Sequence, residues 1–397
     1  MWLLASLPGY VGWRLIPALA AGPAGESLGF AALLAACAVI PLAVNTRSMV
    51  NRRAADRLAW VGLYLMGFLS TLFVATVLRD LFLLTAHAFA DAHIVAAWVR
   101  PSARWALGLT AASTVIGLGM ARWPRLVHID VPVEGLPPAL AGFSIAQISD
   151  LHVGPTIKRG FVERIVRRVN ALQADVIAIT GDLVDGSVAD LSHHTAALAS
   201  LSARHGVFFV TGNHEYYSGE RAWTAELRRL GLTVLKNQHV VLVHDGAPLL
   251  LAGVTDYSAH HFDPAQRSDP AAALRMASPG KSAAGSAGSI PATAATATPT
   301  AATMPKILLA HQPGSAQAAA TAGFDVQLSG HTHGGQFFPW NLLVGFFQPF
   351  TRGMNRLGKL RIYVSRGTGY WGPPNRFGVP SEITRLRLVA APLRPGV

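Results

Sequence analysis

Five short polar clusters contain the side chains of this chain that could bind a metal ion or move a proton. Each directly follows an apolar run, and the clusters are Asp150-Leu151-His152, Gly181-Asp182-Leu183-Val184-Asp185, Gly212-Asn213-His214-Glu215, His311 and Gly330-His331-Thr332-His333. The apolar runs have the length and branching of buried strands. Because ligands of α/β folds bind beyond the carboxyl ends of strands, we expect these clusters to meet at one rim.

The spacing inside the clusters has a physical reason. In Asp150-Leu151-His152 and His331-Thr332-His333, side chains two positions apart on an extended segment point the same way and can reach one ion. The glycines at 181, 212 and 330 are expected to permit tight turns at the strand ends. Carboxylate, amide and imidazole ligands without thiolate favour Mn, Fe or Zn at five or six coordinates over a structural zinc or a calcium cage.

Seven side chains are candidate metal ligands: Asp150, His152, Asp182, Asn213, His311, His331 and His333. This number is too large for one ion and suits two divalent transition-metal ions (Mn, Fe or Zn) that share a carboxylate. Such pairs clamp a phosphoryl oxygen and supply hydroxide as a nucleophile at neutral pH. A single buried histidine such as His311 is more often a core residue, and only its place in the set argues for ligation.

The clusters DLH, GDLVD, GNHE, a single His after a strand, and GHTH occur in an order that resembles the calcineurin-like metallophosphoesterase superfamily over residues 131–388. The apolar N-terminal region, GHTHGGQ and SRGTGYWGPP together resemble its transmembrane, YkuE-like members. The resemblance implies a metal-dependent phosphoric ester hydrolase. It also implies an α/β fold in which two mixed sheets flanked by helices form a four-layer sandwich.

The resemblance further implies a role for each matching residue. One metal ion would be bound by Asp150, His152, Asp182 and His333, and the other by Asp182, Asn213, His311 and His331, with Asp182 as the bridge. The catalytic residues would be Asp182 and His214, where His214 stabilises phosphoryl oxygens or protonates the leaving group. Asp185 and Glu215 would orient the ligands or the histidine. No residue is assigned to the remainder of the substrate.

Hydrophobic periodicity predicts the elements that position these residues. After Arg125, short apolar runs alternate with amphipathic segments such as a helix over 158–172, so we expect an α/β domain over 125–397. A stretch poor in charged and large side chains predicts a disordered insertion near 276–304. Strands are expected at 143–149, 176–180, 207–211, 240–243, 249–254, 307–310, 326–329, 360–365 and 383–389.

Residues 1–124 have the composition of a membrane region. Segment 58–78 contains no charged residue, and as a helix it would be roughly 31 Å long, about the thickness of a hydrocarbon core. Segments 28–44 and 105–121 are shorter uncharged runs that are also expected to span, and 1–20 is either a first span or a surface segment. We therefore expect an all-α transmembrane region of about four helices.

Segment 81–99 determines the membrane topology. Four arginines between residues 45 and 57 place that loop in the cytoplasm by the positive-inside rule. If segment 81–99 does not cross the membrane, everything after Arg122 is cytoplasmic. If it crosses the membrane, the residues after Arg122 face outward. Asp91 inside this segment is costly in lipid, which favours a cytoplasmic catalytic domain at the inner or plasma membrane.

The charge balance favours anionic partners, since 33 Lys and Arg residues against 21 Asp and Glu residues give a net charge of +12. No basic run interleaved with aromatic residues occurs, so nucleic acid is not an expected partner. The expected partners are the membrane and a phosphorylated substrate, which could be lipid-linked. An aromatic segment at 337–350 would contact the bilayer or an acyl chain, or else form an ordinary packed loop.

These observations favour a membrane-anchored phosphoesterase with two metal ions that hydrolyses a phosphate ester or pyrophosphate. Two alternatives stay open at this point. One is an enzyme of lipid A synthesis similar to UDP-2,3-diacylglucosamine pyrophosphohydrolase. The other is a membrane sensor that binds metal or ligand without catalysis.

Overall fold

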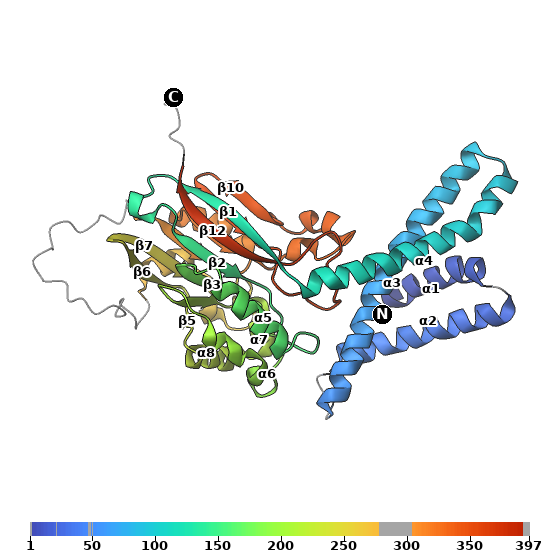
Figure 1. Cartoon of the computed structure of the whole chain (residues 1–397), viewed down its shortest axis with the longest axis horizontal. Coiled ribbons are helices and arrows are strands. Elements are labelled where there is room, and N and C mark those ends of the chain that lie inside the picture. The colour runs from blue at the N-terminus through green and yellow to red at the C-terminus, as the bar shows by residue number, and fades with distance from the viewer. Residues whose placement is uncertain (1, 21, 47–48, 50, 278–303, 392–397) are drawn as a thin grey trace, which may run out of the picture. The chain divides into compact units, whose positions relative to one another are not determined.

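The structure is a computed structural model that describes residues 2–20, 22–46, 49, 51–277 and 304–391 (Figure 1). These residues form two compact units. The helical unit comprises the chain up to Trp123 together with Gln336–Leu342 and Tyr370–Pro380. The α/β unit comprises the remainder. The insertion predicted near 276–304 falls almost entirely on residues 278–303, which lie outside the described residues.

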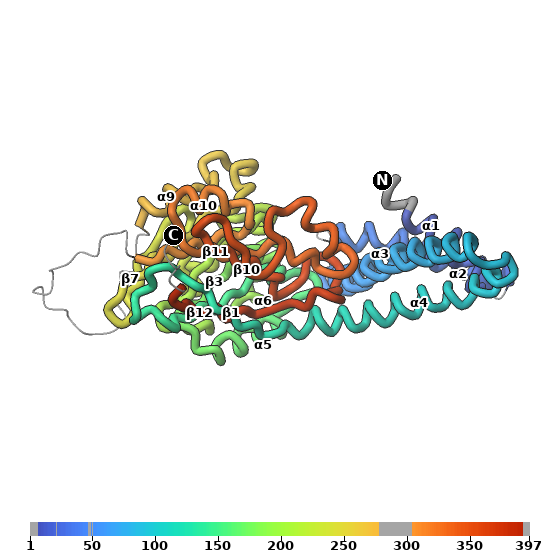
Figure 2. The backbone as a smooth tube through the Cα atoms, turned by 90° about the horizontal axis from the view of Figure 1, so that it is seen from above, coloured from blue at the N-terminus to red at the C-terminus, as the bar shows by residue number. Residues whose placement is uncertain are grey.

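The helical unit contains the four helices expected for the N-terminal region, α1 (Trp2–Leu19), α2 (Pro23–Val44), α3 (Arg52–Phe89) and α4 (Ala92–Arg122). Only Ala90 and Asp91 connect α3 to α4, so the two helices run antiparallel beside each other (Figure 2). Segment 81–99 contains the end of α3, this turn and the start of α4. This segment is therefore not a separate membrane-spanning helix between α3 and α4.

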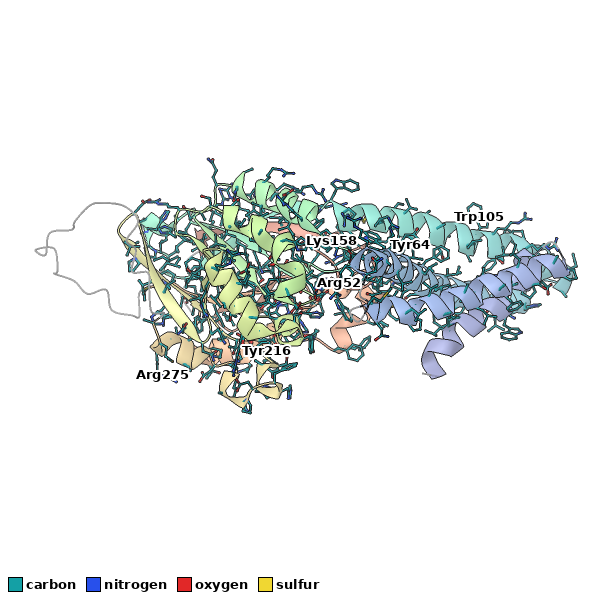
Figure 3. The ribbon with its side chains drawn as sticks, turned by 90° about the horizontal axis from the view of Figure 1, so that it is seen from below. Arg52, Tyr64, Trp105, Lys158, Tyr216 and Arg275 are labelled. Atoms are coloured by element: carbon teal, nitrogen blue, oxygen red, sulfur yellow. The ribbon has the colours of Figure 1, made fainter. Side chains whose placement is uncertain are left out.

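Small residues allow two helices of the helical unit to pack closely. A side chain at Gly62 of α3 would place its Cβ 2.1 Å from the Ala43 Cβ of α2, so the small residues allow close helix contact. By length and composition, α2 and α3 are the two described helices that could span a membrane. Trp105 on the outer face of α4 is 66% exposed (Figure 3). Other large apolar side chains exposed on this unit include Leu28, Leu34, Leu42, Val61, Leu78, Leu84 and Phe89.

The first sheet of the α/β unit has the strand order β1-β12-β2-β3-β4-β5. Strands β2, β3, β4 and β5 are parallel, β12 is antiparallel to β2, and β1 is parallel to β12. The bounds are β1 (Arg125–Val133), β2 (Ser144–Ile148), β3 (Val176–Thr180), β4 (Val207–Val210), β5 (Thr233–Val234) and β12 (Glu382–Ala390). Every residue of β2, β3 and β4 is buried, as continuous apolar runs predict for strands covered on both faces.

The second sheet has the order β10-β11-β9-β8-β7-β6 and is also mixed. Its central strands β11, β9, β8 and β7 are parallel, and antiparallel strands form both edges. The bounds are β6 (Gln238–His244), β7 (Ala247–Gly253), β8 (Lys306–Leu309), β9 (Val326–Ser329), β10 (Gly353–Leu357) and β11 (Leu360–Val364). The fold is thus the expected sandwich of two mixed sheets with helices.

The hydrophobic core lies between the two sheets. Val131, Ile145 and Val176 of the first sheet pack against apolar residues of the second sheet, among them Leu251, Ile307, Val326 and Leu328. Helices α9 (Pro270–Arg275) and α10 (Ala316–Ala322) cover the outer face of the second sheet. On the other side, α5 (Arg159–Asn170), α6 (Val188–Thr195), α7 (Asn213–Ser218) and α8 (Glu220–Arg229) lie beside the first sheet (Figure 1).

Three strands were not predicted, and each has a physical reason. Strand β1 contains charged residues, and its pairing with β12 joins positions more than 250 residues apart, such as Arg125 and Glu382. Strand β5 has only two residues, which is too short to produce a periodic signal. Strand β10 is polar and is stabilised as the outer half of a hairpin with β11.

Candidate metal centre

The polar clusters meet where strands of both sheets end. Asp150 follows β2, Asp182 follows β3 and Asn213 follows β4, while His311 follows β8 and His331 follows β9. The ligand atoms form two groups, Asp150-His152-His333 and Asp182-His311-His331, each with all atoms within 4.8 Å of one another. A third group of this kind is His152-Asp185-His214.

In the first group, two imidazoles and a carboxylate converge on one point. The Nε2 atoms of His152 and His333 are 3.1 Å apart, and His333 Nε2 lies 3.4 Å from Asp150 Oδ1. All three residues are buried. Facing imidazole nitrogens beside a buried carboxylate form a donor set that fits a divalent transition metal.

The second group contains buried polar atoms with unused ligand capacity. His311 Nδ1 donates to the Thr180 carbonyl oxygen at 2.7 Å, which leaves Nε2 as the ring nitrogen that faces Asp182. Nε2 lies 3.1 Å from Asp182 Oδ2 but makes no hydrogen bond among the described residues, and neither does the buried Oδ1 of Asn213. Because buried polar atoms are almost always satisfied, these two atoms without a hydrogen bond fit a metal ion.

Asp182 lies between the two groups. Its Oδ2 is 3.1 Å from Nε2 of His311 and 3.9 Å from Nε2 of His152, which belong to different groups. Its Oδ1 accepts a hydrogen bond from the backbone N–H of His214 at 2.9 Å. This position is the one that a bridging carboxylate would need.

The backbone of five candidate ligands corrects our explanation of the D-x-H and H-x-H spacing. We expected extended segments, but the φ angles are positive at Asp150 (54°), His152 (51°), Asp182 (51°), His331 (71°) and His333 (51°). The left-handed conformation costs free energy for residues with a Cβ and is concentrated at functional sites. The side chains converge because the backbone turns sharply after each strand, not because it continues as a strand.

Two of the three glycines also differ from our expectation. Only Gly181 has a positive φ, at 85°, whereas Gly212 and Gly330 allow close approach of other groups. A Cβ at Gly212 would lie 2.2 Å from Asp182 Oδ1. A Cβ at Gly330 would lie 1.9 Å from Ser149 Oγ and 2.2 Å from Asp150 Oδ2. A side chain at either position would collide with a candidate ligand.

We therefore expect Gly330→Ala to displace Asp150 and to lower metal affinity by at least about tenfold, the size of effect seen when groups that position ligands are lost. Metal titration of the purified variant measures the change. Gly160→Ala in α5 is the matched control, because a Cβ there has no heavy atom within 4 Å. Equal metal affinity in wild type and Gly330→Ala would contradict this role.

A histidine and an aspartate lie beside the two groups. His214 Nδ1 is 2.5 Å from Asp185 Oδ1, and the same oxygen lies 3.2 Å from His152 Nδ1. His214 Nε2 is 4.0 Å from Asp182 Oδ2. Asp185 thus contacts both a candidate ligand and the candidate acid, as expected of a residue that orients them.

Glu215 connects the ends of β3 and β4. Its Oε2 accepts hydrogen bonds from the backbone N–H groups of Gly212 at 2.7 Å and Asp182 at 3.0 Å, and Oε1 accepts from Leu183 at 2.8 Å. The carboxylate is fully buried. It therefore fixes the loop that presents Asp182.

Burial and neighbouring charges raise the pKa of one residue at this site and lower the pKa of others. Burial, with the nearby Asp182 charge, raises the pKa of Glu215 to about 8. Burial also opposes the charged form of Asp185, yet His152 and His214 hold its pKa well below the usual range. Burial and the charge of His311 lower the pKa of His331 to about 4, so its imidazole is neutral, as a metal ligand must be.

Sequence reasoning missed a sixth strand end at this site. Asp256 follows β7, is fully buried, and accepts hydrogen bonds from Gln312 Nε2 at 3.0 and 3.2 Å. Gln312 is the residue directly after His311. The pattern that identified the other clusters, an acidic residue just beyond an apolar run, is present in Val254-Thr255-Asp256 and could have found it.

Comparisons with known proteins agree with this geometry. The profile of the calcineurin-like phosphoesterase family matches residues 143–335. A transmembrane protein with metallophosphoesterase domain from Bos taurus is 38% identical over 300 residues, and the match covers 72% of this chain and 62% of that protein. An uncharacterised metallophosphoesterase from Aquifex aeolicus is 30% identical over 262 residues, which covers 65% of this chain and 89% of that protein. The metallophosphoesterase YkuE of Bacillus subtilis is 27% identical, with 68% and 90% covered.

Proposed function

Because this chain belongs to the calcineurin-like metallophosphoesterase family, whose members are phosphoric ester hydrolases, we propose that it hydrolyses a phosphate ester or pyrophosphate of a membrane-associated, lipid-linked substrate. The observation that carries the proposal is the pair of ligand groups that meet at Asp182. The chain spans 62% of the bovine relative's length, so the activity of the whole protein is a proposal.

The proposed metal ligands are the six residues of the two groups together with Asn213. Asp150, His152, Asp182 and His333 would hold one divalent ion, and Asp182, Asn213, His311 and His331 the other. Two such ions, when bound, activate water near neutral pH and neutralise the phosphoryl oxygens. The donor set of oxygen and imidazole ligands favours Mn, Fe or Zn.

His214 is the proposed proton donor to the leaving group. The contact between its Nδ1 and Asp185 fixes the orientation of the ring, and Nε2 lies on the side of Asp182. A histidine held in this way can stabilise a phosphoryl oxygen and then protonate the leaving oxygen. Asp185 would act through His214, because it contacts the ring and orients it.

Membrane attachment is proposed for the helical unit. Two of its helices are long and apolar enough to span, and large leucine and phenylalanine side chains remain exposed on its surface. In the α/β unit, Phe346 and Phe347 of the aromatic segment are each 81% exposed, which favours contact with a bilayer over the packed-loop alternative. The bovine relative is named a transmembrane protein.

The cytoplasmic side is proposed for the metal centre. Arg52, Arg53 and Arg57 lie in the first turns of α3, and the Arg122 guanidinium at the end of α4 lies 5.8 Å from the ring centroid of Trp60. The chain therefore leaves the helical unit for β1 at the end that carries these arginines. The positive-inside rule assigns that end to the cytoplasm.

A reporter fused after Val397 tests the proposed side in a bacterial host. We expect a fluorescent protein that folds only in the cytoplasm to be active, and alkaline phosphatase, which needs the periplasm, to be inactive. The same pair fused after Asp91 should give the opposite result, because the α3–α4 turn would lie outside. Active phosphatase at the C-terminus would place the metal centre on the outer side.

A panel of substrates tests the proposed reaction. Full-length protein loaded with Mn is assayed on a phosphomonoester, a phosphodiester, a UDP-linked diacylglucosamine and a long-chain lipid phosphate, each lipid beside its short-chain counterpart. We expect at least one lipid to be hydrolysed with a kcat/KM about tenfold above its short-chain form, because binding of the remote acyl chains contributes to transition-state stabilisation. Equal values would contradict a lipid-linked substrate. Metal-loaded protein that hydrolyses nothing would instead favour a sensor.

A further inference from the structure

A second cluster of charged residues lies in the helical unit and takes no part in the metal centre. It forms where α1, α3 and α4 meet, from Arg14, Arg79 and Asp80 with Tyr10 and Ser102. Charged groups among apolar helices are costly and mark functional sites when the helices span a membrane.

Asp80 accepts hydrogen bonds from three side chains. Its Oδ2 lies 2.7 Å from Arg14 Nε and 2.5 Å from the Tyr10 hydroxyl, and its Oδ1 lies 3.1 Å from Arg14 Nη2 and 2.9 Å from Arg79 Nη1. Arg79 is also bound by Ser102 Oγ and the Val99 carbonyl oxygen, each at 3.1 Å. The two guanidinium groups therefore share a single carboxylate, and the cluster has one excess positive charge.

The two arginines differ in how far a ligand can reach them. The Arg79 side chain is 4% exposed and has partners at all three of its nitrogens, whereas the Arg14 side chain is 35% exposed. Nη1 of Arg14 makes no hydrogen bond to any described residue. An anion would therefore bind at Arg14, while Arg79 holds Asp80 in place.

A cavity of about 450 Å³ opens at this cluster. Apart from the charged residues and His87, its walls are mainly apolar and include Trp13, Pro17, Leu83, Leu84, Val95 and Val99. Trp13 places its ring 5.0 Å from the Arg14 guanidinium. A positive group at the wall of an otherwise apolar cavity fits a ligand that has one anionic group and an apolar body.

The position of the cluster along α3 indicates the source of this ligand. Arg79 and Asp80 directly follow the uncharged segment 58–78, which as a helix spans roughly the thickness of the hydrocarbon core. They therefore lie at the level of the lipid headgroups on the side away from Arg52, before α3 ends at Phe89. Leu81 and Leu84 next to them are 54% and 69% exposed and offer an apolar surface for acyl chains.

We propose that the cavity at Arg14 binds the phosphate group of an anionic membrane phospholipid, whose acyl chains lie along α3. The site would hold a structural or regulatory lipid in the leaflet opposite the arginine-rich end of α3. It is separate from the metal centre and does not depend on the hydrolytic reaction.

Native mass spectrometry of the delipidated full-length protein in detergent tests this proposal. The protein is titrated separately with dioleoylphosphatidylglycerol and with zwitterionic dioleoylphosphatidylcholine. A third titration uses dioleoylphosphatidylglycerol in the presence of millimolar inorganic phosphate. We expect one tightly bound phosphatidylglycerol per chain, weaker binding of phosphatidylcholine, and no displacement by inorganic phosphate. Displacement by inorganic phosphate would overturn the assignment to a lipid and indicate a site for free phosphate.

Three variants distinguish a ligand site from an ion pair that only holds the helices together. Arg14→Gln should weaken phosphatidylglycerol binding by at least about tenfold, the effect of losing one charge-assisted contact. Asp80→Asn should strengthen it, because it removes the neutralising charge. Arg104→Gln, at an exposed position of α4 outside the cavity, should leave it unchanged.

If Asp80→Asn weakens phosphatidylglycerol binding as much as Arg14→Gln does, the proposal is overturned in favour of a purely structural ion pair. The proposal is also overturned if Arg14→Gln binds phosphatidylglycerol as tightly as the wild type does. If Arg14→Gln does not yield folded protein, Ala18→Phe keeps both arginines and fills the cavity. Unchanged lipid binding by Ala18→Phe would then contradict the site.

Discussion

Replacement of Asp182 by asparagine is expected to lower kcat for phosphoester hydrolysis by at least about 10³-fold, in the range found when an electrostatic group of a catalytic centre is removed. Asp182 is the residue whose carboxylate faces both ligand groups. Burial opposes its charge, but His311 and other nearby histidines keep its pKa far below the usual range, so the carboxylate is ionised at neutral pH. Asparagine preserves the volume and removes that charge.

Steady-state kinetics and metal analysis of the same preparation measure this effect. We expect Asp182→Asn to lose bound metal together with activity, because one carboxylate would serve both ions. Asp130→Asn is the matched control, since Asp130 is exposed on β1 and, among the described residues, its side chain pairs with Arg387 alone, at 2.8 Å. Activity within a few fold of wild type in Asp182→Asn would rule out the bridging role.

Replacement of His214 by glutamine is expected to lower kcat by about 10²- to 10⁴-fold on alkyl phosphates, whose leaving groups need a proton. The loss should be much smaller on nitrophenyl phosphate, because nitrophenolate leaves without protonation. The Asp185 contact at 2.5 Å orients the His214 imidazole toward the reaction. The rate falls because the glutamine side chain cannot donate a proton in place of this imidazole. The measurement is kcat for a series of leaving groups of decreasing pKa.

Bound metal must be measured in the same His214→Gln preparation. His214 belongs to a third group of potential ligands, with His152 and Asp185. We expect metal content to stay at the wild-type value, whereas a fall in parallel with the rate would make His214 a ligand. The control is His128→Gln, at an exposed histidine of β1 remote in sequence from every cluster.

The sequence predicted the strands that carry the candidate ligands because their apolar runs are continuous and end at polar residues. β3 (Val176–Thr180) and β9 (Val326–Ser329) have the predicted bounds, and β2, β4 and β8 differ by a residue or two. The composition of 58–78 similarly predicted the apolar part of α3. Local pattern was sufficient for strands buried on both faces and for a long uncharged helix.

The remaining features depend on contacts between residues that are far apart in the sequence. The Trp340 Nε1 atom donates to Ser70 Oγ at 2.9 Å within the helical unit, and no local pattern at Trp340 predicts that partner. The pairing of β1 with β12 has the same origin. The positive φ angles of the five candidate ligands could not be predicted either, because such strain is maintained by the surrounding fold.

The central claim is that two ligand groups joined at Asp182 hold two metal ions that together support phosphoester hydrolysis. Titration of metal-free, full-length protein with Mn²⁺, with bound metal and hydrolysis followed in the same samples, tests it most directly. We expect saturation at two ions per chain, with activity that appears only as the second ion binds. Saturation at a single ion, or full activity of the metal-free protein, would contradict it.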